Sequence, residues 1–193
     1  MKRICVFCGS SPGSRPEYRA AAEELGTKLA RSNIGLVYGG GNVGLMGVLA
    51  DAVLAAGGEA VGVIPENLMA LEVGHKGLTK LHVVRSMHER KALMADLSDG
   101  FIAMPGGFGT LEEICEVVTW SQLGLHAKPC GILNVLGYYS PLLAMFDHAV
   151  EERFLKPENR ALVLARDSVV ELLRAMERWR PVRVEKWLDW DTR

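Results

Sequence analysis

Short apolar runs alternate along this chain with longer segments in which apolar residues recur at helical spacing. This alternation is typical of successive strand-helix-strand units, whose strands form a parallel sheet covered by helices. We therefore predict an α/β fold, a three-layer, Rossmann-like, doubly wound parallel sheet of about seven strands with helices on both faces. The predicted strands are Arg3–Cys8, Gly35–Tyr38, Ala60–Ile64, Leu81–Val84, Gly100–Met104, Gly131–Val135 and Leu162–Ala165. The predicted helices are Pro16–Arg31, Gly44–Ala56, Met87–Leu97, Thr110–Leu123, Ser140–Glu152 and Ser168–Arg178.

The length and composition are those of one globular domain. With 193 residues, of which 49% are hydrophobic, the chain can bury a single core without disulfides or metals. We predict one domain over residues 1–180. Pro181 stops the last helix, so residues 181–193 form a tail. The segment Trp187–Trp190 in this tail either docks on the domain, docks on a partner or stays loose.

The charge balance excludes some classes of partner. The chain has 22 Lys and Arg residues against 23 Asp and Glu residues, a net charge of -1 that gives no broad field for binding a polyanion. Nucleic acid is therefore not an expected partner. No apolar stretch reaches the roughly eighteen residues of a membrane span, and Met1–Arg3 leads directly into a predicted strand. We expect a soluble, cytoplasmic protein with no membrane partner.

The spacing of cysteine and histidine residues bears on redox and metal sites. Cys5 and Cys8 have the spacing of a CxxC motif, but they lie in an extended run, where residues three apart point to opposite faces of a sheet. Two small buried strand residues are the favoured interpretation. The 5 histidines never occur at HxxxH or HExxH spacing, and no second cysteine pair completes a ligand set. We predict no metal site.

Glycine and serine follow three of the predicted strands. Gly9–Ser11 follows the first strand, Gly39–Asn42 the second and Pro105–Thr110 the fifth. The carboxyl ends of parallel strands lie at one edge of the sheet, where ligands of this fold class bind. Glycine loops there expose backbone N–H groups, and two of these loops enter a helix directly. The sequence therefore predicts an anion site at this edge.

The segment Pro105–Glu113 (PGGFGTLEE) is the most informative of the three. Its glycines allow a phosphate to approach the main chain, while Thr110 and the first N–H groups of the helix can donate to phosphate oxygens. The competing interpretation is a capping box, in which Thr110 and Glu113 satisfy backbone donors at the helix start. The density of glycine favours the anion site, because a cap needs no close approach to the backbone.

Arg90 lies in an unusual position for a cation. Met87 and Met94 are three and four residues away, so Arg90 projects from a largely apolar face of its predicted helix. A buried carboxylate or a phosphate would explain that position. Alternatively, Glu89, Arg90 and Lys91 form an ordinary solvated charge run, and the spacing alone does not decide between these two interpretations.

Gly39–Gly44 formally matches GxGxxG, with Glu59 or Glu66 near the position of a ribose-binding acid. The dinucleotide fingerprint usually follows the first strand of its unit, whereas here an earlier strand has a Gly-Ser-Ser turn of its own. A wall of a nucleotide pocket, or tight packing of a helix on the sheet, is the preferred interpretation. An NAD-dependent oxidoreductase is the rival enzyme class, and a non-catalytic nucleotide sensor or cofactor carrier is a third possibility.

The chain closely resembles the Lonely Guy (LOG) family. The resemblance is carried, in this order along the chain, by Gly9–Ser11, Tyr38–Gly41, Arg90–Lys91 and the PGGxGTxxE segment. Members of this family are cytokinin riboside 5'-monophosphate phosphoribohydrolases. The resemblance extends from about Lys2 to Met176. Some members have an older label of lysine decarboxylase, but nothing in this sequence indicates a pyridoxal phosphate site, and we expect no cofactor.

The resemblance implies that Arg90 and Glu113 are the catalytic pair and that Gly107, Gly109 and Thr110 hold the phosphate. The other residues assigned to substrate binding are Ser10, Gly40, Gly41, Glu72, Met87, Lys91, Gly106, Phe108 and Thr119. Members of the family are usually homodimers. The apolar run Ile114–Leu125, which includes Trp120, is the candidate surface for a dimer.

The implied reaction is hydrolysis of the N-glycosidic bond of a purine nucleoside 5'-monophosphate, with the free base and ribose 5-phosphate as products. Positive charge develops on the ribose as the base leaves, so a fixed carboxylate favours the reaction. We assign that carboxylate to Glu113, with Arg90 anchoring the substrate and orienting the acid. The preferred base, either adenine or an N6-substituted cytokinin base, is not determined by the sequence.

Overall fold

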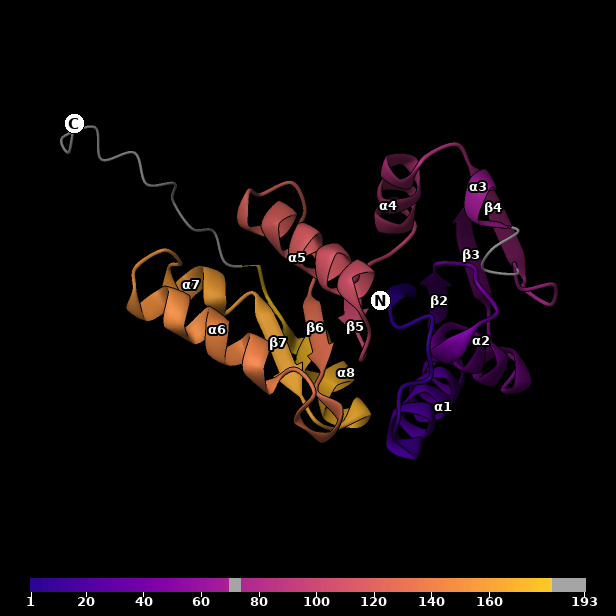
Figure 1. Ribbon diagram of the computed structural model, residues 1–193, viewed down its shortest axis with the longest axis horizontal. Coiled ribbons are helices and arrows are strands. Elements are labelled where there is room, and N and C mark those ends of the chain that lie inside the picture. Colours follow the sequence, from indigo (N-terminus) through magenta and orange to yellow (C-terminus); the bar gives the residue numbers. More distant parts are fainter. Residues whose placement is uncertain (70–73, 182–193) are drawn as a thin grey trace.

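A parallel sheet of seven strands forms the centre of the chain (Figure 1). The structure is a computed structural model, and it describes residues 1–69 and 74–181. The strand order is β4-β3-β2-β1-β5-β6-β7, and every neighbouring pair is parallel. The strands are β1 (Arg3–Phe7), β2 (Gly35–Tyr38), β3 (Ala60–Pro65), β4 (Lys80–Val84), β5 (Phe101–Ala103), β6 (Cys130–Leu133) and β7 (Val163–Arg166).

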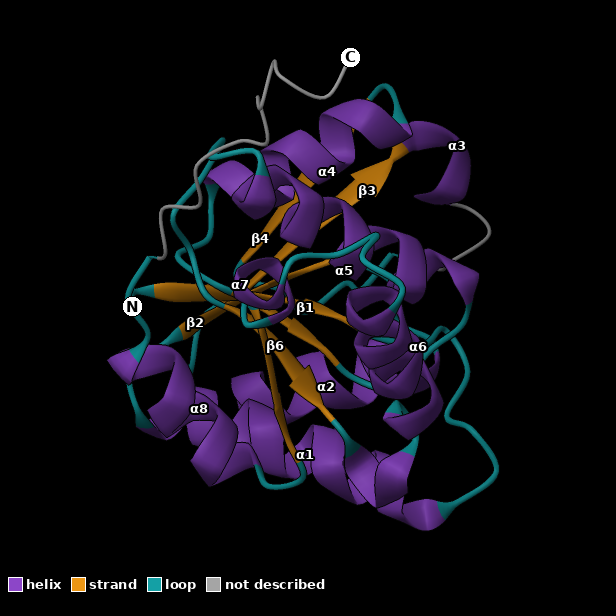
Figure 2. Cartoon of the chain, turned by 90° about the vertical axis from the view of Figure 1, so that its left-hand side faces the viewer, coloured by secondary structure: helices purple, strands orange, loops and turns teal. Residues whose placement is uncertain are grey.

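Helices cover both faces of this sheet (Figure 2). The helices are α1 (Pro16–Arg31), α2 (Gly44–Ala55), α3 (Glu66–Met69), α4 (Met87–Asp96), α5 (Phe108–Gln122), α6 (Ser140–Glu151), α7 (Pro157–Arg160) and α8 (Val169–Arg178), with a 3-10 turn η1 (Val135–Gly137). Helices α1, α2 and α8 pack on one face, and α4, α5 and α6 lie on the other. Among the described residues, no helix combines the length and the apolar character needed to cross a membrane.

Strand β1 shows how the sequence separates the two faces. Ile4, Val6 and Cys8 belong to the core under α1, α2 and α8, whereas Cys5 and Phe7 belong to the core under α4 and α5. Cys5 and Cys8 are therefore buried on opposite faces, as the alternation of side chains along a strand predicts. Burial raises the pKa of both thiols, which keeps them protonated and unreactive.

The order of the strands places the functional edge. From β1 the chain proceeds outward through β2, β3 and β4, and then returns to β5 on the other side of β1. The topological switch point therefore lies between β1 and β5, and the helices that follow these two strands, α1 and α5, cover opposite faces of the sheet. Gly9 N–H donates to Pro105 O at 3.0 Å, so the loops after β1 and β5 are in direct contact.

The predicted fold class is confirmed. Each predicted strand and long helix begins and ends within two residues of the observed element. The short helices α3 and α7 and the turn η1 were not predicted, because three or four residues are too few to show a helical period. Helix α5 begins at Phe108 rather than at Thr110. The predicted tail lies outside the described residues from position 182 onward.

Candidate active site

A cavity of about 230 Å³ opens at the switch point between β1 and β5. The loops after β1, β2 and β5 border it, together with the starts of α4 and α5. Its walls are formed by Val6, Phe7, Cys8, Gly9, Ser10, Gly39, Met46, Arg90, Met94, Gly107, Phe108, Gly109, Thr110 and Glu113. Loops that are far apart in the sequence thus converge at the edge where the glycine pattern predicts an anion site.

Helix α4 presents Arg90 to this cavity. Ser86 caps the helix, its hydroxyl accepting from Glu89 N–H at 3.1 Å, while Oε2 of Glu89 accepts from Arg85 N–H at 2.9 Å. This reciprocal arrangement resembles a capping box and fixes the first turn of α4. Arg90 follows directly, and its Nε donates to the main-chain oxygen of Val63 on β3 at 3.2 Å.

The glycine at position 39 makes room for that guanidinium. A Cβ on residue 39 would overlap with Nη2 of Arg90 and would also press on Met46. Gly39 follows β2 directly, so the main chain of this loop forms the wall behind Arg90. The first glycine of the formal GxGxxG match therefore serves close packing of an arginine side chain.

Glu113 reaches the cavity from α5. Gly107 is the N-cap of this helix, so Thr110 and Glu113 lie within its first two turns and are 4% and 8% exposed. The capping-box interpretation of Thr110 and Glu113 is therefore wrong, because the helix has already begun two residues before Thr110. The helix begins at Phe108, directly after the glycine loop that follows β5, so the threonine lies inside its first turn.

Arg90 and Glu113 face each other across the cavity. Nη1 of Arg90 lies 3.7 Å from Oε1 of Glu113, and the two side chains are 8% and 10% exposed. A buried cation and a buried carboxylate at this distance interact far more strongly than they would in water. The pair gives the cavity an acid or base for proton transfer beside a fixed positive charge.

The main chain at the start of α5 is open to a ligand. A Cβ added at Gly107 or Gly109 would meet no atom within 4 Å. The first N–H groups of a helix lack partners within it, and the helix dipole favours an anion at this end. Oγ1 of Thr110 occupies the place where a Cβ on Gly106 would stand, so the two residues are in close contact. This geometry suits a phosphate group.

The remaining predicted residues are distributed around the cavity. Ser10 and Phe108 line it, and Sδ of Met87 lies 3.8 Å from Nη1 of Arg90. Gly106 borders a neighbouring cavity of about 300 Å³, which is also lined by Ser10 and Gly107.

Gly40 and Gly41 pack away from the cavity. Gly40 has a φ of +79° and lies against Ile64 and Val63, while Gly41 bridges to Gly74. His75 N–H donates to Gly40 O at 3.0 Å and so holds this corner. These glycines therefore serve tight packing of the loop after β2, which is one of the two interpretations that the sequence left open.

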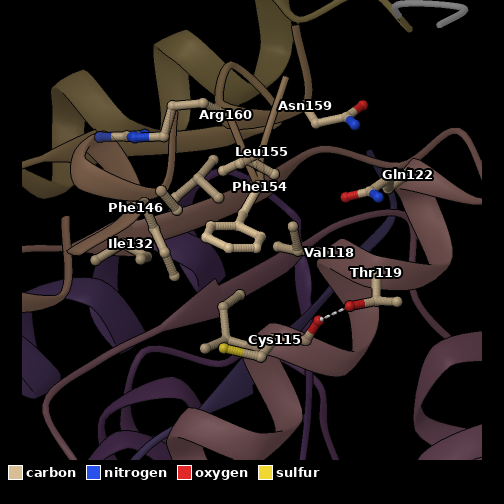
Figure 3. A pocket seen from close by; sticks show the side chains of 13 residues that line it. Cys115, Val118, Thr119, Gln122, Ile132, Phe146, Phe154, Leu155, Asn159 and Arg160 are labelled. Atoms are coloured by element: carbon tan, nitrogen blue, oxygen red, sulfur yellow. Dashed lines mark hydrogen bonds between the residues drawn. The ribbon is translucent and has the colours of Figure 1, made fainter. Parts of the chain in front are cut away.

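Among the described residues, Lys91 and Thr119 are two further predicted substrate contacts that do not line this cavity. Nζ of Lys91 lies between two carboxylates of α5. Thr119 lines a separate apolar cavity of about 270 Å³, where its hydroxyl donates to Cys115 O (Figure 3). Glu72 lies outside the described residues.

Two tyrosines that were not predicted from the sequence support the glycine loop after β5. The hydroxyl of Tyr138 donates to Gly106 O at 2.6 Å, and that of Tyr139 donates to Met104 O at 2.7 Å. Both follow the turn η1, and together they hold the end of β5 and the glycines after it. The local signal in the sequence is the pair Tyr138-Tyr139 itself, since a buried tyrosine hydroxyl usually finds a hydrogen-bond partner.

Sequence comparison identifies relatives of this chain. A family model described as possible lysine decarboxylase matches residues 46–176. Cytokinin riboside 5'-monophosphate phosphoribohydrolase LOG1 of Arabidopsis thaliana is 52% identical over 180 residues, which are 93% of this chain and 84% of the relative. LOG7 of the same plant is 49% identical over 192 residues, or 98% of this chain and 88% of the relative. The chain belongs to the LOG family.

Solved structures share the fold of this LOG-family chain. The structural genomics target TM1055 has a TM-score of 0.71 at 23% identity and covers 93% of this chain and 100% of its own. The molybdenum cofactor carrier protein MCP of Chlamydomonas reinhardtii has a TM-score of 0.70 at 20% identity, covering 91% and 95%. Identities this low show a common fold and nothing about common chemistry.

Proposed function

We propose that this LOG-family enzyme hydrolyses the N-glycosidic bond of a purine nucleoside 5'-monophosphate, releasing the base and ribose 5-phosphate. The observation that carries the proposal is the buried Arg90–Glu113 pair beside an open helix N-terminus. The names of the related plant enzymes indicate a cytokinin riboside 5'-monophosphate as the substrate. The substrate class thus includes AMP and its N6-substituted forms.

Glu113 and Arg90 divide the chemistry between them. As the bond from C1' to the base breaks, its electron pair leaves with the base and positive charge develops on the ribose. Glu113 stabilises this charge and accepts a proton from the water whose oxygen attacks C1'. The base takes up its proton from solvent. Arg90, anchored on Val63 O, orients Glu113 and contacts the substrate.

The start of α5 selects monophosphates. Gly107, Gly109 and Thr110 hold the 5'-phosphate, and this remote contact places the sugar against Glu113. A nucleoside without its phosphate lacks that contact and reacts slowly. Ser10 and Phe108 border the bound nucleotide, whereas Met87 supports the Arg90 guanidinium.

The walls of the cavity argue against two other activities. Among the described residues, no lysine lines the cavity, so no group there is available for a Schiff base of the kind used in amino-acid decarboxylation. Gly41 and Gly44, two glycines of the GxGxxG match that a dinucleotide would have to approach closely, pack against Gly74 and the main chain of Ser10 instead.

The enzyme is proposed to be a homodimer. Helix α6 is largely apolar, yet in the part of the chain that the structure describes none of its residues is buried. Met145 on α6 is 58% exposed, and Phe154 after it is 91% exposed. Phe154 lines the apolar cavity of about 270 Å³, together with residues of α5 and α6 (Figure 3). A surface of this kind is expected to be covered by a second copy, which would bring Ile114–Leu125 of the two copies close together.

A single domain over residues 1–180 and a location in the cytoplasm complete the proposal. Both helical layers pack on the same sheet, which supports a single domain. All four cysteines are free thiols, which is typical of a reducing compartment.

Product analysis tests the proposed reaction. The full chain is incubated with AMP, N6-isopentenyl AMP, GMP, CMP and adenosine, and free base and ribose 5-phosphate are quantified by chromatography. We expect base release from the adenine monophosphates and little from adenosine. If AMP binds but no base appears, the protein is a nucleotide carrier. If NAD(H) binds and quenches tryptophan fluorescence, the oxidoreductase interpretation is favoured.

A further inference from the structure

Lys91, the residue after Arg90 on α4, is held between two carboxylates of α5. Its Nζ donates to Oε1 of Glu112 at 2.5 Å and to Oε1 of Glu116 at 2.9 Å. Only 14% of the Lys91 side chain is exposed, against 54% for Glu112 and 26% for Glu116. The ammonium group is therefore bound to the helix that carries Glu113.

These three groups depend on one another for their charge. Burial lowers the pKa of the Lys91 ammonium, but its hydrogen bonds to Glu112 and Glu116 outweigh burial and raise the pKa above its ordinary value. Within the described residues, Oε2 of Glu116 is buried and has no hydrogen-bond partner. Lys91 is thus the cation that neutralises this half-buried carboxylate, and removing it leaves the carboxylate poorly solvated.

Helices α4 and α5 rest on different parts of the sheet. Helix α4 packs on β3 and β4, whereas α5 packs on β1, β5 and β6. The separation of Arg90 from Glu113 therefore depends on how these two helices are held relative to each other. Lys91 follows Arg90, and Glu112 precedes Glu113. The ion pair between Lys91 and Glu112 therefore joins α4 and α5 directly beside the pair between Arg90 and Glu113.

We propose that Lys91 is a positioning residue, whose ion pairs to Glu112 and Glu116 hold Glu113 at its distance from Arg90. This inference rests on the proposed function and replaces the direct substrate contact that the family resemblance implies for Lys91. A displacement of about 1 Å at a catalytic group can cost on the order of a hundredfold in rate. The proposed phosphate site at the start of α5 (Gly107, Gly109 and Thr110, the phosphate seat) is on the same helix as Glu113. It therefore moves together with Glu113 and keeps its affinity for phosphate.

The test compares Lys91→Met, Lys91→Arg, Glu116→Gln and the double variant Lys91→Met/Glu116→Gln. Arg19→Met is the matched control, because it removes a cation from an exposed ion pair with Glu23 on α1. Turnover of AMP gives kcat and KM, and calorimetry gives the affinity for ribose 5-phosphate. A crystal structure of Lys91→Met gives the distance between Arg90 and Glu113.

Lys91→Met is expected to lower kcat by about ten- to a hundredfold, with little change in KM or in the affinity for ribose 5-phosphate. Lys91→Arg restores most of the rate, and Glu116→Gln lowers it in the same direction. The double variant is expected to be no slower than Lys91→Met, because both changes break one interaction. The distance from Arg90 to Glu113 lengthens beyond the 3.7 Å of the parent.

Several results would overturn the inference. A large loss of affinity for ribose 5-phosphate in Lys91→Met, but not in Glu116→Gln, would make Lys91 a direct ligand of the substrate. An unchanged kcat in both variants would leave the cluster with a role in stability alone. If Lys91→Met does not fold, the double variant and Glu116→Gln still decide between these outcomes. If the parent protein releases no base, the proposed function fails, while the distance between Arg90 and Glu113 in Lys91→Met still tests the positioning role of Lys91.

Discussion

Arg90 is a guanidinium with only 8% of its side chain exposed, so every contact around it matters. A main-chain oxygen on β3, the carboxylate of Glu113 and the sulfur of Met87 surround it, and Gly39 leaves the space that its Nη2 occupies. Breaking such a buried pair by removing one partner typically costs about 3–5 kcal/mol of stability. This arrangement at the edge of a cavity indicates a role in binding or chemistry.

Single residues were predictable where the relevant pattern is local. Arg90 stands out because its helical neighbours Met87 and Met94 are apolar, and Glu113 because it closes the PGGxGTxxE motif. The surroundings of Lys91 could not be predicted, since Glu116 lies 25 positions further along the chain on another helix. Only the tertiary structure brings those charges together.

Gly109 offers a test that separates ligand binding from folding. It lies in the first turn of α5 with open space where a Cβ would stand. Gly109→Ala should raise the free energy of unfolding by about 0.5–1 kcal/mol, because alanine favours the helix. The same methyl group would intrude on the phosphate seat, so KM for AMP should rise severalfold.

Denaturant titration and steady-state kinetics measure the two effects of Gly109→Ala. Thr27→Ala is the control, a helix-favouring change near the end of α1 and remote from the cavity. It should raise stability and leave KM unchanged. A Gly109→Ala protein with unaltered KM would contradict the phosphate seat.

At the scale of elements, apolar runs bounded by glycine were sufficient to predict the strands. The start of α5 was predicted two residues late because threonine is a preferred N-cap, whereas Gly107 occupies that position and Thr110 is buried within the helix. Tertiary packing therefore overrode a local preference. The helices α3 and α7 are a single turn each and have no amphipathic pattern to detect.

The turn η1 contains a strained residue. Leu136 has φ 54° and ψ 27°, a left-handed conformation that costs a branched L-residue about 1–2 kcal/mol. Its side chain is 51% exposed, so little packing is lost on replacement. We expect Leu136→Asn to raise the free energy of unfolding by about 0.5–1 kcal/mol, because asparagine tolerates this region.

Asn33 provides the reciprocal control for that substitution. It also has a φ of 54°, just after α1, and it is exposed. Asn33→Leu should destabilise the protein by a similar amount in the same denaturation experiment. A loss of stability in Leu136→Asn would show that the leucine side chain packs more favourably than its exposure indicates.

His126 makes the region between α5 and β6 sensitive to acid. Its Nε2 donates to Val117 O at 2.8 Å, and its Nδ1 accepts from Lys128 N–H at 3.1 Å, so the neutral ring is fully hydrogen-bonded. Burial lowers the pKa of His126, the hydrogen bond to Val117 raises it in part, and the net direction is downward. Burial lowers the pKa of His82 as well.

The sign of the pH effect follows from these shifts. A histidine whose pKa is lower in the folded state stabilises the protein above its ordinary pKa of about 6.5, and this contribution is lost as the pH falls through the folded pKa. The free energy of unfolding should therefore decrease between about pH 7 and pH 5. His126→Gln should flatten this dependence, whereas His88→Gln on the exposed side of α4 should not. A dependence unaffected by His126→Gln would contradict the assignment.

At the scale of the whole molecule, the strand order β4-β3-β2-β1-β5-β6-β7 determines where chemistry can occur. The alternation of strands and helices in the sequence predicts this architecture and the edge that binds ligands. The exposed apolar surface of α6 could not be predicted from the sequence, because the exposure of a helix depends on which other helices pack beside it.

Association through α6 can be broken by a single charge. Met145 is 58% exposed on the proposed interface, so Met145→Glu should shift sedimentation from dimer to monomer and weaken association by a few kcal/mol. Val83→Glu, at a position 47% exposed on the edge strand β4, is the control and should leave the dimer intact. A parent protein that sediments as a monomer at all concentrations would contradict the proposed homodimer.

The central claim is that Glu113 promotes the attack of water on the ribose of a nucleotide whose phosphate is bound at the start of α5. The direct measurement is single-turnover release of adenine and ribose 5-phosphate from AMP by the parent protein and by Glu113→Gln. We predict a fall in rate of about 10²–10⁴-fold in Glu113→Gln, with AMP still bound at comparable affinity. A folded Glu113→Gln protein that releases adenine at the parent rate would contradict the account.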